Sequence, residues 1–265
     1  MRHIISVGGG LASTMELPER VIQEYGRDNV ELVMCKLPNE DEDVWRLVES
    51  VEKMLGVSVK MIGLNLTPLD IFFQVRMLGN SRVDPCSRML KREIMADWMS
   101  ANCDPANTVL HVGVTYDEVD RMLAIARNWK QAGWNVDAPL SRDSSITRDW
   151  LMAKSLRLFG FIPRLYMMGM SHNNCGGACI KAGHAQWARL LWHLPDVYEW
   201  WETGENKFRD NIGEFTILSE GRIKRPLTLT AFRERMLTRW ANMLPGLDPF
   251  DGLLETPPCV YCEAT

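Results

Sequence analysis

The sequence predicts an α/β protein with a doubly wound, five-stranded parallel sheet and a small, cysteine-rich α+β subdomain at its C-terminal end. Three observations carry this prediction. Short apolar runs alternate with stretches of helical periodicity up to residue 162, and glycines follow several of the runs. Such alternation is typical of right-handed crossovers between parallel strands. The length of 265 residues fits one large domain with an appended subdomain.

The apolar runs place the expected strands at 3–7, 30–35, 57–62, 108–113 and 135–138. The first expected helix begins at Ser13. The other expected helices lie at 41–55, 87–102, 118–132 and 146–159. Thr147 is the expected N-cap of the helix at 146–159, and Gly160 is its expected end.

The amino-acid composition changes after residue 162, where Gly, Asn, Cys and Met become frequent. We expect an ordered loop at 163–183, a helix at 183–194, a hairpin of 215–218 with 226–229, and a last helix at 229–244. The chain is therefore expected to divide into an α/β domain over 1–162 and a C-terminal subdomain over 163–265 that packs on it.

Composition excludes several classes of protein. The net charge is −4, from 30 Lys and Arg against 34 Asp and Glu, so no general attraction for nucleic acid follows. No uncharged apolar run approaches the ~18 residues of a membrane span, and no signal peptide is evident. We expect a cytoplasmic protein without a membrane partner. In a reducing compartment, the seven cysteines indicate metal or redox chemistry before disulfides.

A glycine-rich segment, Gly8, Gly9 and Gly10, directly follows the first expected strand. Backbone N–H groups at such a turn, with the Ser13 and Thr14 hydroxyls at a helix start, can cradle a phosphate. The segment is not a Walker loop, because the Gly-Lys-Ser/Thr end is missing, and Ser13 breaks the Gly-x-Gly-x-x-Gly pattern. The alternative is a tight turn that packs the helix on the strand.

The same segment resembles the loop of the PP-loop ATP pyrophosphatase superfamily, the adenine nucleotide alpha hydrolases, usually Ser-Gly-Gly-x-Asp/Gly-Ser-Thr. The matching positions are Gly9, Gly10, Ser13 and Thr14. Gly8 replaces the usual serine, and Ala12 replaces the usual aspartate or glycine. The resemblance implies a PP-loop (HUP-type) nucleotide-binding domain over 1–162 that holds ATP or a related adenine nucleotide with Mg²⁺.

Two later segments resemble the phosphoadenosine phosphosulfate reductase branch of this superfamily. Residues 80–92 are similar to its Cys-Cys-x-x-Arg-Lys segment, with Cys86 as the second cysteine. Arg88 and Lys91 are candidates to hold phosphate or sulfate oxygens, and a solvated helix face is the alternative. Residues 139–179 follow the order of a reductase series and end in Asn-Asn-Cys-Gly-Gly-x-Cys, a form similar to a branch common in phage genomes. The resemblance covers about residues 1–180.

Further candidates follow the expected strands, at the edge where open α/β sheets bind ligands. Met34 is the second-last residue of the second expected strand and Gly113 ends the fourth, so both are candidate nucleotide-binding residues. The acidic run 40–43 can hold Mg²⁺ on a nucleotide, or it can simply form a favourable helix N-terminus.

The spacing of the cysteines is the most specific indication of function in the sequence. The resemblance implies a [4Fe–4S] cluster on Cys86, Cys175 and Cys179. The fourth position is either vacant or filled by Cys262 or Cys259. Zinc is the alternative, because thiolates also suit a structural Zn²⁺. Cys259 and Cys262 form a Cys-x-x-Cys pair that can act as a catalytic redox dithiol on the tail.

The resemblance implies an ATP-dependent, adenylating enzyme of sulfur chemistry that transfers sulfur to an acceptor, among which a nucleobase or nucleic acid is one option. One alternative is a reductase of phosphoadenosine phosphosulfate or adenylylsulfate, with Cys259 or Cys262 as the nucleophile. Another is a degenerate, non-catalytic protein that binds a nucleotide or a cluster. The sequence leaves open the acceptor, the donor and whether the chain forms a homodimer.

Overall fold

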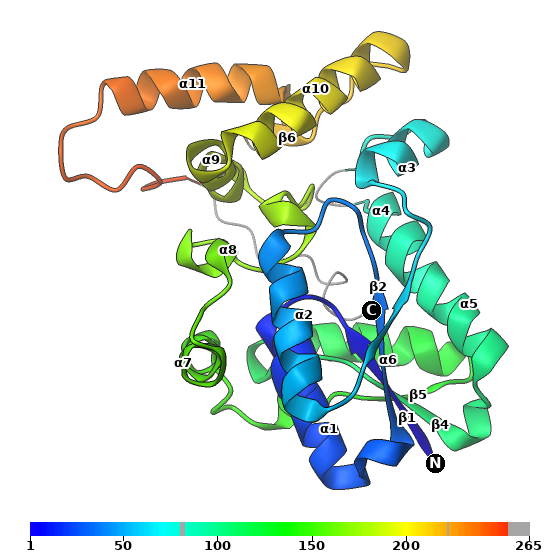
Figure 1. Cartoon of the computed structure of the whole chain (residues 1–265). Helices are drawn as coiled ribbons and strands as arrows, with labels where there is room; N and C mark the ends of the chain where they lie inside the picture. The colour runs from blue at the N-terminus through cyan, green and yellow to red at the C-terminus, as the bar shows by residue number, and fades with distance from the viewer. Residues whose placement is uncertain (80–82, 222, 254–265) are drawn as a thin grey trace.

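The computed structural model describes residues 1–79, 83–221 and 223–253. Five strands form one parallel sheet in the order β3-β2-β1-β4-β5 (Figure 1). Their bounds are β1 Arg2–Val7, β2 Val30–Cys35, β3 Val59–Ile62, β4 Thr108–His111 and β5 Asn135–Asp137. The predicted α/β fold class is confirmed, and the strand order reverses between β1 and β4, so their carboxyl ends flank a topological switch point.

Helices cover both faces of the sheet. Their bounds are α1 Leu17–Tyr25, α2 Glu42–Leu55, α5 Glu93–Asn102, α6 Val119–Gln131 and α7 Arg148–Phe159. Ile5 packs in one core with residues of α1, α2 and α7, whereas its neighbour Ile4 packs in a second core with residues of α5 and α6. Successive strand residues point to opposite faces, so both faces are apolar and the sheet is doubly wound.

Two helices begin with a widened, π-helical turn. One turn, η1 Ala12–Glu16, follows the glycine-rich segment and leads into α1. The other, η3 Arg88–Arg92, joins the short α4 Pro85–Ser87 to α5, so the helix expected at 87–102 consists of three pieces. π-Turns are rare and occur frequently at functional sites, and both turns here carry candidate residues.

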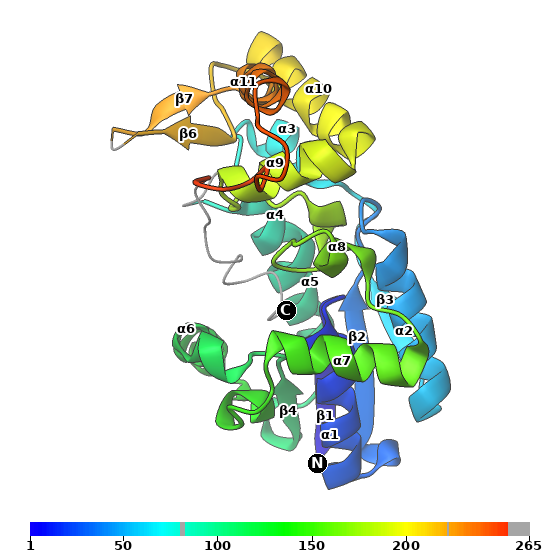
Figure 2. The same cartoon turned by 90° about the vertical axis from the view of Figure 1, so that its left-hand side faces the viewer.

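The C-terminal elements stack above the carboxyl ends of the strands (Figure 2). Their bounds are α8 Arg164–Met167, α9 His184–His193, α10 Pro195–Asn211, β6 Leu218–Glu220, β7 Arg225–Leu227 and α11 Leu229–Ala241. β6 and β7 form the antiparallel hairpin, a few residues away from the expected positions 215–218 and 226–229. Short 3₁₀ turns lie at Arg27–Asn29, Pro105–Asn107, Tyr116–Glu118, Pro139–Arg142 and Cys175–Gly177.

The core of the C-terminal part reaches across the predicted domain boundary. Trp187, Trp201 and Phe232 pack in one cluster with Leu69 and Phe72 of α3, Pro68–Val75. The division at residue 162 stays a prediction, and α3 contributes to the core on its far side. Within the described residues, none of the helices has the length and apolar character that a bilayer crossing requires.

Candidate functional site

The glycine-rich segment leaves β1 and closes on its own helix start. The Gly8 N–H donates to Ser13 Oγ at 3.1 Å, and the Gly9 N–H donates to Thr14 Oγ1 at 3.0 Å. The Ser13 and Thr14 side chains are buried. In this arrangement the loop's own hydroxyls accept the donors that a phosphate would use, so a bound phosphate must replace these hydroxyls as acceptor.

Helix α8 and the segment after it cover the glycine-rich loop. Asn173 Nδ2 donates to the Gly9 carbonyl at 3.1 Å, and the Leu11 N–H donates to Tyr166 Oη at 3.3 Å. Asn173 is fully buried. Sequence reasoning quoted Asn173 only as part of a motif and did not identify its contact, because the two partners are 164 residues apart.

Gly113 and Met34 occupy different surroundings. A Cβ on Gly113 would lie 2.5 Å from the Ser13 Cα, so the strand end after β4 packs directly against the loop. Met34 is buried in the core shared by α1, α2 and α7. The structure thus brings Gly113 to the loop and places Met34 in the packing beneath it.

Three cysteines surround one small cavity. Cys86, from α4, lines it together with Cys175 and Cys179, and its volume of about 10 Å³ has room for roughly one water molecule. Within the described ranges, no group of three or more His, Cys, Asp or Glu side chains is arranged to hold a metal ion. The thiols fit the ligand type of an iron–sulfur or zinc centre. The cavity would have to widen to admit a cluster.

The backbone at Cys175 explains the Gly-Gly that follows it. Cys175 has φ +55° and Gly176 has φ +59°, both in the left-handed region that side chains disfavour. A Cβ on Gly176 would lie 2.8 Å from the Asn39 carbonyl oxygen. The chain therefore turns sharply here and brings Cys175 and Cys179 to the same cavity. Cys259 and Cys262 lie outside the described residues.

The two basic candidates are placed differently. Lys91 is buried on the η3 turn, with its Nζ 3.6 Å from Glu40 Oε1, and only 4% of its side chain is exposed. Glu40 also accepts a hydrogen bond from the Cys175 N–H. Arg88 lies at the surface and pairs with Glu93 at 3.6 Å. Through Glu40, Lys91 is therefore linked to the loop that carries Cys175. Arg88 lies outside this group of residues.

The acidic run starts α2 and anchors an arginine. Asp41 is the N-cap and accepts from the Asp43 N–H at 3.0 Å. Arg164 donates to Asp41 Oδ2 at 2.9 Å and also pairs with Glu42. These partners raise the pKa of Arg164, although its partial burial opposes them. This geometry matches the helix-start alternative, and a role in holding Mg²⁺ stays a prediction.

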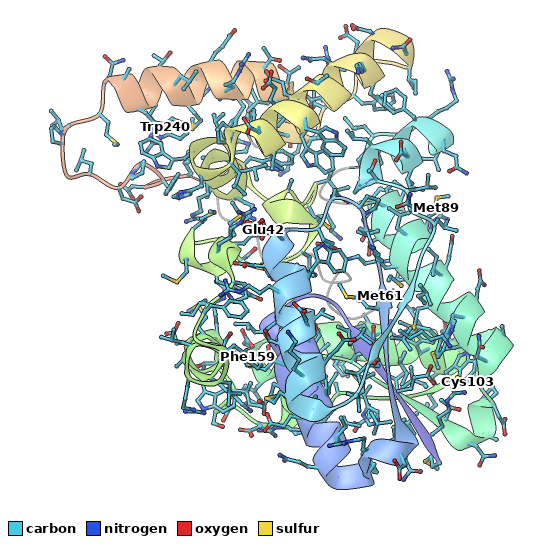
Figure 3. The ribbon with its side chains drawn as sticks, in the orientation of Figure 1. Glu42, Met61, Met89, Cys103, Phe159 and Trp240 are labelled. Atoms are coloured by element: carbon cyan, nitrogen blue, oxygen red, sulfur yellow. The ribbon has the colours of Figure 1, made fainter. Side chains whose placement is uncertain are left out.

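A larger cavity of about 330 Å³ adjoins the thiol cavity, the small cavity that Cys86, Cys175 and Cys179 line. It lies between the start of α2 and the start of α10, and Cys175 and Trp201 line both cavities. Figure 3 shows Glu42, one of its lining residues, at the α2 end that faces the C-terminal elements. The sequence predicted neither this cavity nor α10, whose buried face includes Glu202, Gly204 and Glu205 and therefore breaks the apolar pattern.

Comparisons with known proteins identify similar solved structures but no matching family or curated sequence. No protein-family profile and no curated protein sequence matches the chain. Among solved structures, the U34-tRNA thiolase NcsA from Methanococcus maripaludis with its [4Fe-4S] cluster is similar at 14% sequence identity and a TM-score of 0.36. The match covers 89% of this chain and 80% of that chain. A likeness at this TM-score carries no argument about function.

Proposed function

We propose that the chain is an adenine-nucleotide-dependent enzyme that activates an acceptor as its adenylate and transfers sulfur to it. One observation carries the proposal: a single segment joins the two candidate halves of the site. Asn173 in this segment binds the glycine-rich loop, and Cys175 and Cys179 meet Cys86 at the thiol cavity. A nucleotide on the loop would therefore lie next to the thiols.

The proposed reaction has two steps. A carbonyl oxygen of the acceptor attacks the α-phosphorus of ATP, and pyrophosphate leaves. A sulfide then attacks the activated carbon, and AMP leaves with the former carbonyl oxygen. The acceptor exchanges oxygen for sulfur without net oxidation or reduction, because sulfur enters as sulfide.

The chain's residues divide between these steps. The loop, Gly8 to Gly10 with Ser13 and Thr14, would hold the phosphates, and Lys91 would offset negative charge near the loop that carries Cys175. Mg²⁺ would bind the nucleotide phosphates. Cys86, Cys175 and Cys179 would hold three irons of a [4Fe–4S] cluster, and the fourth iron would supply a binding position for the sulfide. Cys262 is the candidate ligand of that fourth iron and would occupy it only when no sulfide is bound. Cys259 and Cys262 are the remaining candidates for a catalytic dithiol.

Anaerobic purification with iron, sulfide, zinc and absorption measurements tests the thiol centre. We expect a brown protein with about four irons and four sulfides and a broad band at about 400 nm. Cys86→Ser, Cys175→Ser and Cys179→Ser should each lower the iron content. Cys103→Ser is the matched control, because Cys103 lies at the far end of α5 (Figure 3). A colourless protein with one zinc, or equal iron in all variants, contradicts the cluster.

The nucleotide half has its own measurement. Pyrophosphate release from ATP should require Ser13, so Ser13→Ala should reduce it strongly while metal content stays unchanged. Undiminished release in Ser13→Ala would contradict the role of the loop.

A further inference from the structure

We propose that Asp84 is a positioning residue of the thiol cavity: its carboxylate pairs with Arg92 and with Lys181 and so holds together the two segments that carry the thiols. Asp84 and Lys181 are the charged residues among those that line the thiol cavity in the described part of the chain. The inference rests on the thiol centre of the proposed function, and it concerns residues outside the set of candidate ligands.

The first segment begins at Asp84, which is the N-cap residue of α4 and is followed by Pro85. An aspartate at this position ordinarily accepts a hydrogen bond from the first turn of its own helix. Among the described residues at this helix start, the Asp84 side chain accepts no such bond. Its carboxylate faces Arg92 on the η3 turn, with Oδ1 3.3 Å from Nη2 and Oδ2 3.5 Å from Nη1. The departure from the local preference indicates a requirement set by the tertiary structure.

Asp104 shows the ordinary arrangement in the same chain. It also precedes a proline, Pro105, at the start of a 3₁₀ turn, and its side chain accepts from the Ala106 N–H at 3.0 Å. Asp104 is exposed, whereas only 12% of the Asp84 side chain is exposed. The same dipeptide therefore caps its own turn at the surface and forms ion pairs beside the thiols.

The second segment is the turn that begins at Cys179. The Ala182 N–H donates to the Cys179 carbonyl at 2.9 Å, so Lys181 lies within this turn. Lys181 Nζ is 3.6 Å from Asp84 Oδ2, and 14% of the lysine side chain is exposed. Lys181 therefore ties the turn of Cys179 to a carboxylate that lies two residues before Cys86.

One carboxylate thus serves two cations from distant parts of the chain. All three side chains are largely removed from water, so the loss of one partner leaves a charge without full compensation. Residues that orient metal ligands from outside the ligand set typically contribute about 10–100-fold to metal affinity. We expect the distance of the Cys86 thiol from the other two thiols to depend on Asp84 in this way.

Anaerobic titration of the metal-free, full-length chain with Co²⁺ measures this contribution, because thiolate-to-cobalt charge-transfer absorption reports how many thiolates bind. Asp84→Asn should weaken Co²⁺ binding about tenfold or more and reduce the charge-transfer band. Lys181→Met should act in the same direction, and Lys181→Arg should restore the affinity because it keeps a cation for Asp84. The double variant Asp84→Asn with Lys181→Met should lose little more than Asp84→Asn alone, since both substitutions remove one shared contact.

Asp104→Asn is the matched control, because it changes the same residue type at the same position before a proline and does not line the thiol cavity. It should leave Co²⁺ binding unchanged. Melting temperatures show which variants fold. Lys181→Met leaves the pair of Asp84 and Arg92 in place, so it tests the contact even if Asp84→Asn fails to fold.

A second measurement needs no metal. Dibromobimane links two thiols that lie close together, and it should join Cys86 to one of the other two thiols of the cavity in the metal-free chain. Peptide mapping by mass spectrometry identifies the link. The link should be largely lost in Asp84→Asn and in Lys181→Met, and it should be retained in Asp104→Asn.

Two results would overturn the positioning role: Co²⁺ affinity and linking in Asp84→Asn and Lys181→Met that match the unmodified chain, or fully additive losses in the double variant. An unmodified chain that binds no Co²⁺ but forms the link would contradict the proposed thiol centre, and the linking in the variants would then decide the role of Asp84. An unmodified chain that shows neither would overturn both.

Discussion

Gly113 shows how one residue without a side chain joins two parts of the site. The position follows β4, and its Cα faces the backbone of Ser13 so closely that a Cβ would lie 2.5 Å from the Ser13 Cα and 2.8 Å from the Ser13 nitrogen. Backbone cannot move aside as a flexible side chain can. The glycine is therefore required by packing, and nucleotide contact is a separate prediction for the same residue.

Gly113→Ala should lower the free energy of unfolding by about 2–3 kcal/mol, because the methyl group overpacks a backbone contact. Nucleotide affinity should fall as well, since the glycine-rich loop must shift. Urea denaturation and ATP titration measure the two effects. Gly133→Ala is the control: its Cβ would meet nothing within 4 Å, and only its φ of +85° costs about 1 kcal/mol. Equal losses in both variants would refute the packing argument.

Helix α7 shows how the local sequence and a distant partner combine in one element. The Thr147 side chain accepts from the Trp150 N–H at 3.2 Å, and Gly160 ends the helix with φ +74°, as predicted. Lys154 on this helix donates from Nζ to Glu16 Oε2 and to Glu19 Oε2, each at 2.6 Å. These ion pairs raise the pKa of Lys154 against the opposing effect of its burial, so the lysine stays charged and ties α7 to the start of α1.

Thr147→Ala should lower the free energy of unfolding by about 1 kcal/mol, because the Trp150 N–H loses its acceptor. Chemical denaturation followed by circular dichroism measures this change. Thr238→Ala, within the exposed part of α11, removes the same atoms without removing a cap, so it should be neutral or slightly stabilising. A Thr147→Ala variant as stable as the unmodified chain would show that the cap contributes nothing.

At the scale of the whole molecule, one buried carboxylate joins three regions of the chain. Glu40 lies just before α2, its Oε1 is 3.6 Å from Lys91 Nζ on the η3 turn, and it also accepts from the Cys175 N–H. The Glu40 side chain is 0% exposed. Both charges are removed from water, so each depends on the other for compensation.

Lys91→Met should destabilise the fold by about 3–5 kcal/mol, because it leaves a buried carboxylate without its cation. The double variant Lys91→Met with Glu40→Gln should recover a large part of this loss, since a neutral amide oxygen can still accept from Cys175. A double-mutant cycle in urea measures the coupling. Strictly additive effects of the two substitutions would show that the buried pair is not coupled.

Local patterns in the sequence account for most of the sheet and its helices. The range 30–35 was predicted for β2 and is observed without change, and α2 differs from its predicted range by one residue. α3 and α10 were not predicted. In α10, buried Glu205 accepts from the backbone of Ile217 and Leu229, so its inward position depends on partners that periodicity does not show.

The candidate site divides in the same way. The glycine-rich loop is a candidate from its own residue types, whereas the resemblance to a known family grouped Cys86 with the later cysteine pair. The resemblance implied that the three cysteines meet, but the sequence showed neither the contact that Asn173 makes with Gly9 nor the cavity beside Trp200. Strand alternation and helix caps act over a few residues and can be read along the chain. A cavity forms where residues from distant segments meet, so only their packing in three dimensions defines it.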